Sequence, residues 1–157
     1  MTNQTNQSNP DRQSLSEKRS WSRSYSTRVK GVEPEKIWKV WTDIDHWHTW
    51  QSDIEYAKLE GEFKPGSTFT LKPVKGPKVK IRLHRVEPLR NFTDLTRFPG
   101  ARMYGSHDFI CHGDELEIKT TIELEGFMSF LWRKIVAEDI VKSLPEQTKN
   151  LIARAGG

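Results

Sequence analysis

Hydrophobic and polar residues alternate along most of the chain with the two-residue period that is typical of β-strands. The alternation is clearest at residues 115–125, where Leu116, Ile118, Ile122 and Leu124 share one face and charged residues occupy the other. This pattern is expected of an antiparallel sheet with one face in water. Six further strands are predicted, at residues 21–30, 54–59, 67–72, 78–86, 91–98 and 102–112. Glycine and proline between most of these segments predict turns, so the later strands form a meander.

The stretch from Glu33 to Trp50 has a helical period and holds four of the six tryptophans. Pro34 fits the first turn of a helix, where a missing N–H costs nothing. One face of this helix carries Ile37, Trp38 and Trp41, and the helix should stop near Asp43. A second short helical turn is expected around Trp47 and Trp50, so two short helices follow the first strand.

The C-terminal segment is predicted to form one long helix starting at Phe127. Its apolar stripe consists of Phe127, Leu131, Ile135, Ile140, Leu144, Leu151 and Ile152. Pro145 lies inside the stripe and removes one backbone hydrogen bond, which predicts a kink or break near residues 141–144.

The order of these elements predicts an α+β fold. A curved seven-stranded antiparallel sheet, with two short helices after its first strand, closes over the long C-terminal helix and leaves a cavity between them. Residues 1–20 are polar and charged, so we expect a disordered tail there and a folded domain at 21–155.

The composition fits one domain with a substantial core, since the chain has 157 residues of which 34% are hydrophobic. Neither a run of 18 apolar residues nor a signal peptide is evident, so we expect a cytoplasmic protein without stable membrane insertion. Cys111 is the only cysteine, which excludes an internal disulfide. It shares the parity of the inward residues of its strand and is predicted to be a small buried hydrophobe.

The net charge of +4 does not indicate nucleic-acid binding, because it belongs to the first 30 residues. That segment holds six basic and two acidic residues, and the remaining chain holds 19 of each. No recognised basic–aromatic motif accompanies the excess, so we expect no nucleic-acid partner.

A set of short motifs is spread over about residues 21–154. It consists of Pro34-Glu35-Lys36-Ile37-Trp38, Thr42-Asp43, Trp47, Trp50, Gly66, Val86-Glu87-Pro88 before Phe92, His107, and Leu144-Pro145 followed by Leu151. In these motifs the chain resembles the START-like (SRPBCC) helix-grip superfamily, and within it the polyketide cyclase/dehydrase and lipid-transport group. The resemblance implies the helix-grip fold with an internal pocket. The superfamily includes aromatase/cyclases, lipid and quinone carriers, and chaperone co-factors, so it leaves the function open.

His107 is the most interesting ionisable residue predicted to face inward, because its strand should also point Phe109 into the core. An imidazole can act as acid, base or hydrogen-bond anchor for a ligand. The alternative is a structural histidine bonded to a neighbouring strand or to the final helix. Asp94 could face inward beside it, or else lie at a strand irregularity or pair with a surface arginine. Tyr104 is a further candidate for proton transfer.

The aromatic residues divide into expected core and expected pocket. Trp38 should pack the first helix on the sheet, whereas Trp41, Trp47 and Trp50 could line the mouth of the pocket. Phe127, Met128, Phe130 and Trp132 could form the opposite lip. The predicted ligand-binding residues are Trp41, Trp47, Trp50, Phe69, Leu83, Tyr104, His107, Phe109, Leu131 and Ile135.

No metal site or cofactor is predicted. His46 and His48 are two residues apart, so on a helix they point apart, and no cysteine or carboxylate cluster completes a tetrahedral set. No nucleophile elbow or phosphate loop is present.

Two functions from different classes fit the sequence. The first is a carrier or sensor that binds a small hydrophobic or amphipathic molecule between the sheet and the C-terminal helix. The second is a polyketide cyclase/dehydratase or aromatase-type enzyme that uses His107 as an acid or base. An enzyme needs at least two ionisable groups near the substrate. Only His107 is firmly placed inward, so the sequence favours binding.

Overall fold

The computed structural model describes residues 20–156 of the chain. The disordered tail expected at residues 1–20 lies outside the described residues, apart from Ser20, which opens the first strand. Among the described residues, no helix is both long enough and apolar enough to cross a membrane.

Seven antiparallel strands form one sheet, as the alternation predicts. The order across the sheet is β1-β7-β6-β5-β4-β3-β2, so only β1 departs from a simple meander. The strands are β1 (Ser20–Lys30), β2 (Ile54–Glu60), β3 (Thr68–Pro73), β4 (Val79–Glu87), β5 (Asn91–Phe98), β6 (Ala101–His112) and β7 (Glu115–Glu125).

Two short helices connect β1 to β2: α2 (Pro34–Thr42) and the 3₁₀-helix η1 (Ile44–Thr49). Pro34 occupies the first turn of α2, and the helix buries Ile37 and Trp41. At Asp43 the backbone leaves the helical region, with φ −83° and ψ 73°. The two helices therefore meet at the predicted residue.

The chain ends in a helical segment of three parts: α3 (Ser129–Trp132), the π-helical turn η2 (Arg133–Ala137) and α4 (Glu138–Arg154). Helix α4 runs through Pro145 without the predicted break. The irregularity lies instead in η2, upstream of the proline. A helix that keeps its other backbone bonds and packs on a sheet can continue past one lost bond.

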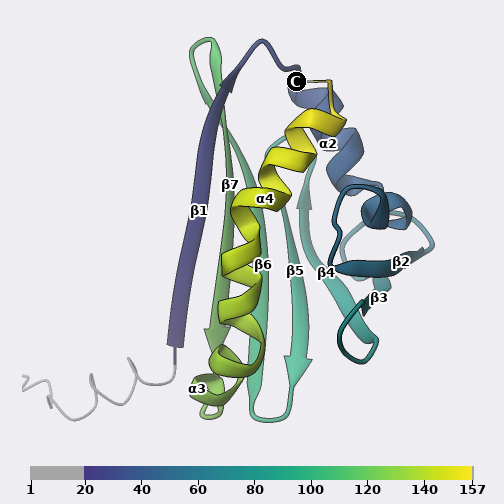
Figure 1. Cartoon of the computed structure of the whole chain (residues 1–157), viewed down its shortest axis with the longest axis vertical. Coiled ribbons are helices and arrows are strands. Elements are labelled where there is room, and N and C mark those ends of the chain that lie inside the picture. Colours follow the sequence, from purple (N-terminus) through teal and green to yellow (C-terminus); the bar gives the residue numbers. More distant parts are fainter. Residues whose placement is uncertain (1–19, 157) are drawn as a thin grey trace, which may run out of the picture.

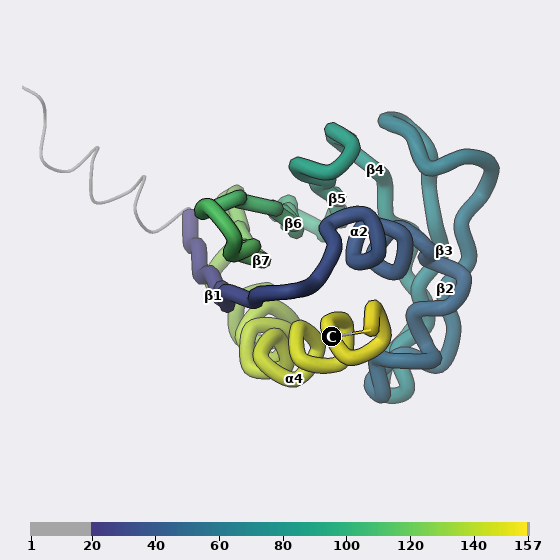
Figure 2. Tube along the Cα trace, turned by 90° about the horizontal axis from the view of Figure 1, so that it is seen from above, coloured from purple at the N-terminus to yellow at the C-terminus, as the bar shows by residue number. Residues whose placement is uncertain are grey.

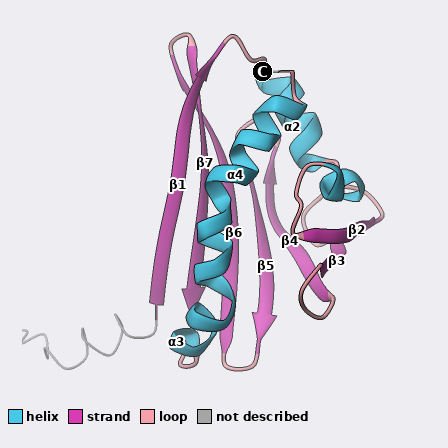
Figure 3. Cartoon of the chain, in the orientation of Figure 1, coloured by secondary structure: helices cyan, strands magenta, loops and turns pink. Residues whose placement is uncertain are grey.

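The sheet curves, and all the helices lie on its concave side (Figure 3). Helix α4 runs along the length of the molecule in front of the strands (Figure 1). In the view from above, α4 lies across the open side of the curved sheet, and α2 lies inside the curve (Figure 2). This is the helix-grip arrangement, which confirms the predicted fold class.

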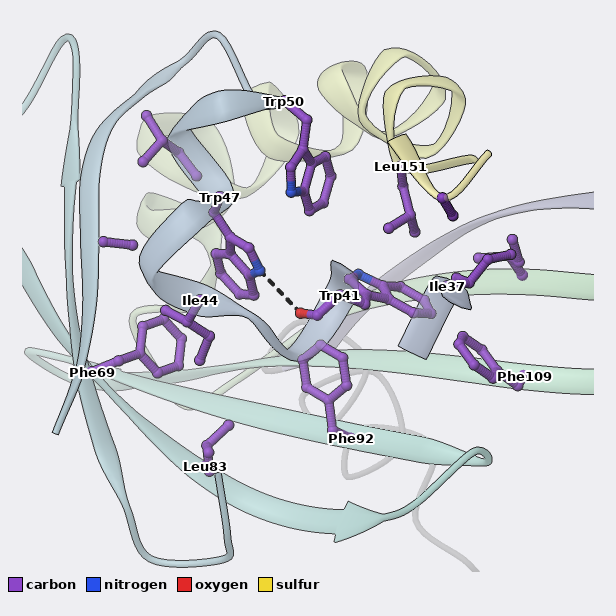
Figure 4. Close-up of a cluster of buried hydrophobic side chains, with 14 of the residues drawn as sticks. Ile37, Trp41, Ile44, Trp47, Trp50, Phe69, Leu83, Phe92, Phe109 and Leu151 are labelled. Atoms are coloured by element: carbon purple, nitrogen blue, oxygen red, sulfur yellow. Dashed lines mark hydrogen bonds between the residues drawn. The ribbon is translucent and has the colours of Figure 1, made fainter. Parts of the chain in front are cut away.

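The buried hydrophobic residues form two separate groups. The first core cluster joins α2 and η1 to the sheet, and Figure 4 shows its aromatic centre. The second core cluster lies where the helical C-terminal segment crosses β6 and β7. Its buried members are Met103, Ile122, Leu124, Ala137 and Leu144. The space between helix and sheet is thus not filled by one continuous core.

Candidate functional site

A cavity of about 920 Å³ lies between the concave face of the sheet and the helices. Residues of both core clusters line it, including Trp41 and Phe69 from the first and Met103 and Leu144 from the second. Most of the remaining wall is also apolar and comes from η1, β3, β4, η2 and α4. The cavity therefore separates the two clusters.

Three of the four tryptophans of the 33–50 stretch line the cavity: Trp41, Trp47 and Trp50. All three are buried, so they form its wall more than an exposed rim. Trp47 Nε1 donates to the carbonyl of Trp41 at 2.9 Å (Figure 4), and the carbonyl of Trp50 accepts from Asn150 Nδ2 at 3.0 Å. The first bond fixes the Trp47 indole against α2, and the second ties the end of η1 to α4 through the backbone of Trp50.

Trp38 belongs to the core, as expected. Its ring meets Phe63, Phe92 and Phe109 edge-on, with centroids 5.8–6.2 Å apart. Such contacts are favourable arrangements of aromatic rings.

Asp94 and His107 form a polar pair in the cavity wall. Asp94 Oδ2 lies 3.2 Å from His107 Nε2, and their side chains are only 13% and 14% exposed. The two residues come from the adjacent strands β5 and β6, and both line the cavity. Asp94 lies at the register shift between β4 and β5, as one alternative expected, and its partner is His107 instead of a surface arginine. His107 is bonded to a neighbouring strand, and it also faces the cavity.

Gly105 provides the space that Asp94 occupies. It lies directly opposite Asp94 in the β5–β6 register. A Cβ atom at position 105 would stand 2.9 Å from Asp94 Oδ1 and 3.0 Å from Oδ2. The carboxylate thus lies over the glycine on the concave face of the sheet.

Aromatic rings fix the orientation of the His107 imidazole. Phe92 stacks on it with a centroid distance of 4.2 Å, and Trp41 meets it edge-on at 4.9 Å. With Nε2 held by Asp94, the ring is clamped on several sides. A positioned imidazole is what either an acid–base step or a specific hydrogen bond needs.

Three buried polar atoms of the cavity wall have no hydrogen-bond partner among the described residues. They are His107 Nδ1, Thr96 Oγ1 and Trp50 Nε1. Buried polar atoms are nearly always paired, so these three atoms are the unusual polar groups of the cavity wall.

Four of the predicted ligand-binding residues do not line the cavity. Leu83 and Phe109 face the concave side, but they are packed inside the first core cluster. Tyr104 lies on the other face of the sheet, where its hydroxyl reaches Glu125 at 3.3 Å and its ring meets His84. Leu131 is half-buried in α3, away from the cavity wall. Tyr104 therefore cannot move protons on a molecule in this cavity.

The prediction that residues at the start of the C-terminal helix form the opposite lip of the pocket is only partly correct. Trp132 lines the cavity, but Phe127 and Phe130 are 68% and 58% exposed, and neither they nor Met128 reach it. Ile135 does line it and is 53% exposed. The exposed lining residues come from η2 and the start of α4, from residues 52–53 and from the loop at residues 74–77. The cavity reaches solvent between these segments.

Asp94 is the main site residue that sequence reasoning left undecided. A carboxylate on the inward parity of a strand suggests a site, but from sequence alone a strand irregularity or a surface arginine is the favoured explanation. The useful signal was Gly105, because a glycine within a central strand often marks close approach of another group.

The other candidates lie outside the cavity. Cys111 is exposed, contrary to prediction, because β5 pairs with β6 only as far as Asp108, so Cys111 has a neighbouring strand on one side only. No cluster of three metal-ligating side chains occurs in residues 20–156. His46 Nδ1 lies 2.9 Å from Asp43, and the hydrogen bond that the imidazole donates to that carboxylate raises the pKa of His46. The hydrogen bond with His112 lowers the pKa of Glu117.

A long helix gripped by a curved antiparallel sheet, with a cavity between them, defines the START-like (SRPBCC) helix-grip superfamily. The model of the family described as Activator of Hsp90 ATPase homolog 1-like protein matches residues 31–126. The chain therefore belongs to that family. A search of curated proteins finds no match to this sequence.

Solved structures of very different sequence share the fold. A hypothetical protein, jhp0584 from Helicobacter pylori, aligns with a TM-score of 0.69 at 16% identity, over 86% of this chain and 88% of that one. Norcoclaurine synthase from Thalictrum flavum, in complex with dopamine and hydroxybenzaldehyde, aligns with a TM-score of 0.66 at 15% identity, over 85% of each chain. The di-domain ARO/CYC StfQ of the steffimycin biosynthetic pathway aligns with 0.76 at 9% identity, over 93% of this chain and 54% of that one.

Proposed function

We propose that this protein binds a small hydrophobic or amphipathic molecule in the cavity between the sheet and α4, as a carrier or sensor. The observation that carries the proposal is the cavity itself. Its volume of about 920 Å³ lies in the range of ligand pockets, and four indoles and two phenylalanines contribute to its wall.

The related folds support this proposal. Norcoclaurine synthase was solved with two small aromatic molecules bound, and the steffimycin pathway protein is an aromatase/cyclase domain pair. Small aromatic or polycyclic guests would suit the present cavity, because flat rings can pack against Trp41, Trp47 and Trp50.

Filling the cavity should abolish uptake. Met103 is buried and lines the cavity from β6. We expect Met103→Trp to weaken the binding of Nile red, an apolar fluorescent dye, at least about tenfold, since the indole takes the space of the guest. Ile110 lies on the same strand with its side chain exposed on the other parity, so Ile110→Trp is the matched control.

Fluorescence titration of the three proteins, with circular dichroism to confirm folding, decides the matter. Binding by the wild type and by Ile110→Trp, with loss in Met103→Trp, supports the proposal. Absence of dye uptake by the wild type, or equal affinity in both variants, would contradict it.

Acid–base catalysis is the second candidate, and the Asp94–His107 pair is the observation that favours it. The pair supplies two ionisable groups at one place in the cavity wall, which the sequence alone did not. Asp94 would hold the imidazole while His107 transfers a proton during cyclisation or dehydration of a polyketide-like substrate.

The His107→Ala variant separates the two candidates. For an enzyme, the variant should still take up Nile red but convert a poly-β-ketone thioester more slowly than the wild type, by a factor of about 10²–10⁴. Product formation can be followed by absorbance and mass spectrometry. Equal conversion rates in wild type, variant and buffer would exclude this chemistry and leave binding alone.

A further inference from the structure

We propose that the guest of the cavity carries a hydrogen-bond donor, a hydroxyl or an ammonium group, on an otherwise apolar body, and that the Asp94 carboxylate accepts it. This inference rests on the proposed binding function and adds the chemical class of the ligand.

The carboxylate of Asp94 has spare capacity to accept hydrogen bonds. An ionised carboxylate only accepts, and its two oxygens offer about four sites. In the described part of the chain its side chain has one hydrogen bond, which Oδ2 accepts from His107 Nε2 at 3.2 Å. A charged group that is 13% exposed and so weakly paired is costly unless another donor approaches it. Because Asp94 lines the cavity, that donor can come from the guest.

This carboxylate lies against the sheet, in the space that Gly105 leaves open. A Cβ atom at position 105 would stand 2.9 Å and 3.0 Å from its two oxygens, so the carboxylate would have to shift. Glycine weakens a strand by about 0.5–1 kcal/mol relative to alanine. Keeping an acid in this place thus has a cost, which a role in recognition would explain.

The charged residues of the cavity wall also favour a guest with a donor group. Lys75 is the only lysine or arginine among the described lining residues, and it lies in the exposed loop at residues 74–77. Asp53 and Asp139 line the exposed part as well. A guest with a carboxylate, such as a fatty acid, would meet Asp94 without a compensating cation and should be rejected.

The neighbourhood of Asp94 suits a small polar head rather than a long polar chain. Thr96 follows it on the same face of β5, and its buried Oγ1 has no partner within residues 20–156. Elsewhere in the wall, the buried donor Trp50 Nε1 also lacks a partner in this part of the chain. The rest of the wall is mainly apolar. A single hydroxyl or amine on a ring system matches this distribution.

Four naphthalene compounds of similar size test the proposal by displacement of Nile red at neutral pH. They are 2-naphthol, 2-(aminomethyl)naphthalene, 2-methoxynaphthalene and 2-naphthoate. We expect the wild type to bind the naphthol, the amine or both about tenfold more tightly than the methoxy compound, and the naphthoate most weakly. Whichever of the first two binds tighter identifies the donor.

The variant Asp94→Asn removes the charge with little change of shape. It should lose about tenfold in affinity for the amine and no longer discriminate against the naphthoate. Glu123→Gln, which removes an exposed charge from β7, should keep the wild-type ranking. The ranking in the wild type tests the proposal even where Asp94→Asn is poorly folded.

Two failures can be distinguished. If the wild type does not take up Nile red, the binding function and this inference fall together. If it takes up the dye but binds the methoxy compound as tightly as the naphthol and the amine, or if Asp94→Asn keeps the full ranking, only the inference is overturned.

Discussion

Gly105 and Asp94 show how one missing side chain can place a functional group. Alanine would usually be preferred over glycine at a strand position, and Gly105 does not have a positive φ that would require glycine. The reason for glycine is instead the carboxylate opposite it, about 3 Å from where Cβ would be. The pair is therefore coupled, and neither residue can be understood alone.

This coupling can be measured in a double-mutant cycle. We expect Gly105→Ala to lower the free energy of unfolding by about 1–3 kcal/mol, because the methyl group overpacks against Asp94. In the Asp94→Ala background the same change should be neutral or stabilising by up to about 1 kcal/mol.

Chemical denaturation of the four proteins gives the coupling energy, which should exceed about 1 kcal/mol. An equal cost for Gly105→Ala in both backgrounds would show that the carboxylate does not fill the space above residue 105.

At the scale of elements, the C-terminal helical segment is held at both ends and irregular between them. Near its start, Trp132 stacks on Phe98 with ring centroids 4.4 Å apart, and its Nε1 donates to the carbonyl of Pro99 at 2.9 Å. Near its end, Asn150 bonds Trp50. The π-helical turn η2 lies between these attachments and lines the cavity with Ile135 and Val136. Such turns are frequent at functional sites, which agrees with a cavity that opens there.

Pro145 gives a prediction for α4 itself. The helix continues through it, so the carbonyl of Val141 loses its usual N–H partner without any break to relieve the strain. Because Pro145 is exposed, its replacement sacrifices little packing. We expect Pro145→Ala to raise the free energy of unfolding by about 1–3 kcal/mol.

The neighbouring exposed residue offers a control, since Glu146→Ala should change the free energy of unfolding by less than about 0.5 kcal/mol. Thermal and urea unfolding of both variants measures the difference. A Pro145→Ala protein no more stable than the wild type would indicate that the proline is accommodated without cost.

At the scale of the whole molecule, local patterns were enough for the fold but not for the site. Strands such as β7 follow from alternation, and Trp41 and His107 follow from their place on inward faces. The same inward faces also include Leu83, which the core covers, and Cys111, which lies near the end of β6 and is exposed. Which inward residues meet a cavity depends on where the helices leave the sheet uncovered, and no local pattern contains that information.

The cavity also divides the hydrophobic core, and the division should appear in the energetics. Ile37 belongs to the first core cluster and Leu124 to the second, and both are fully buried. With no common cluster, Ile37→Val and Leu124→Ala should be additive in the ligand-free protein to within about 0.5 kcal/mol. The single changes should cost about 0.5–1.5 and 2–5 kcal/mol.

A pair within the first core cluster provides the contrast. Phe92 and Phe109 share Trp38 and Trp41 as ring neighbours, so Phe92→Leu and Phe109→Leu should interact by more than about 0.5 kcal/mol. Urea denaturation of all single and double variants measures both couplings. Equal coupling in the two pairs would mean that the empty cavity does not separate the clusters. If the effects of Ile37→Val and Leu124→Ala are additive in the ligand-free protein but not when a guest is bound, the guest completes the core.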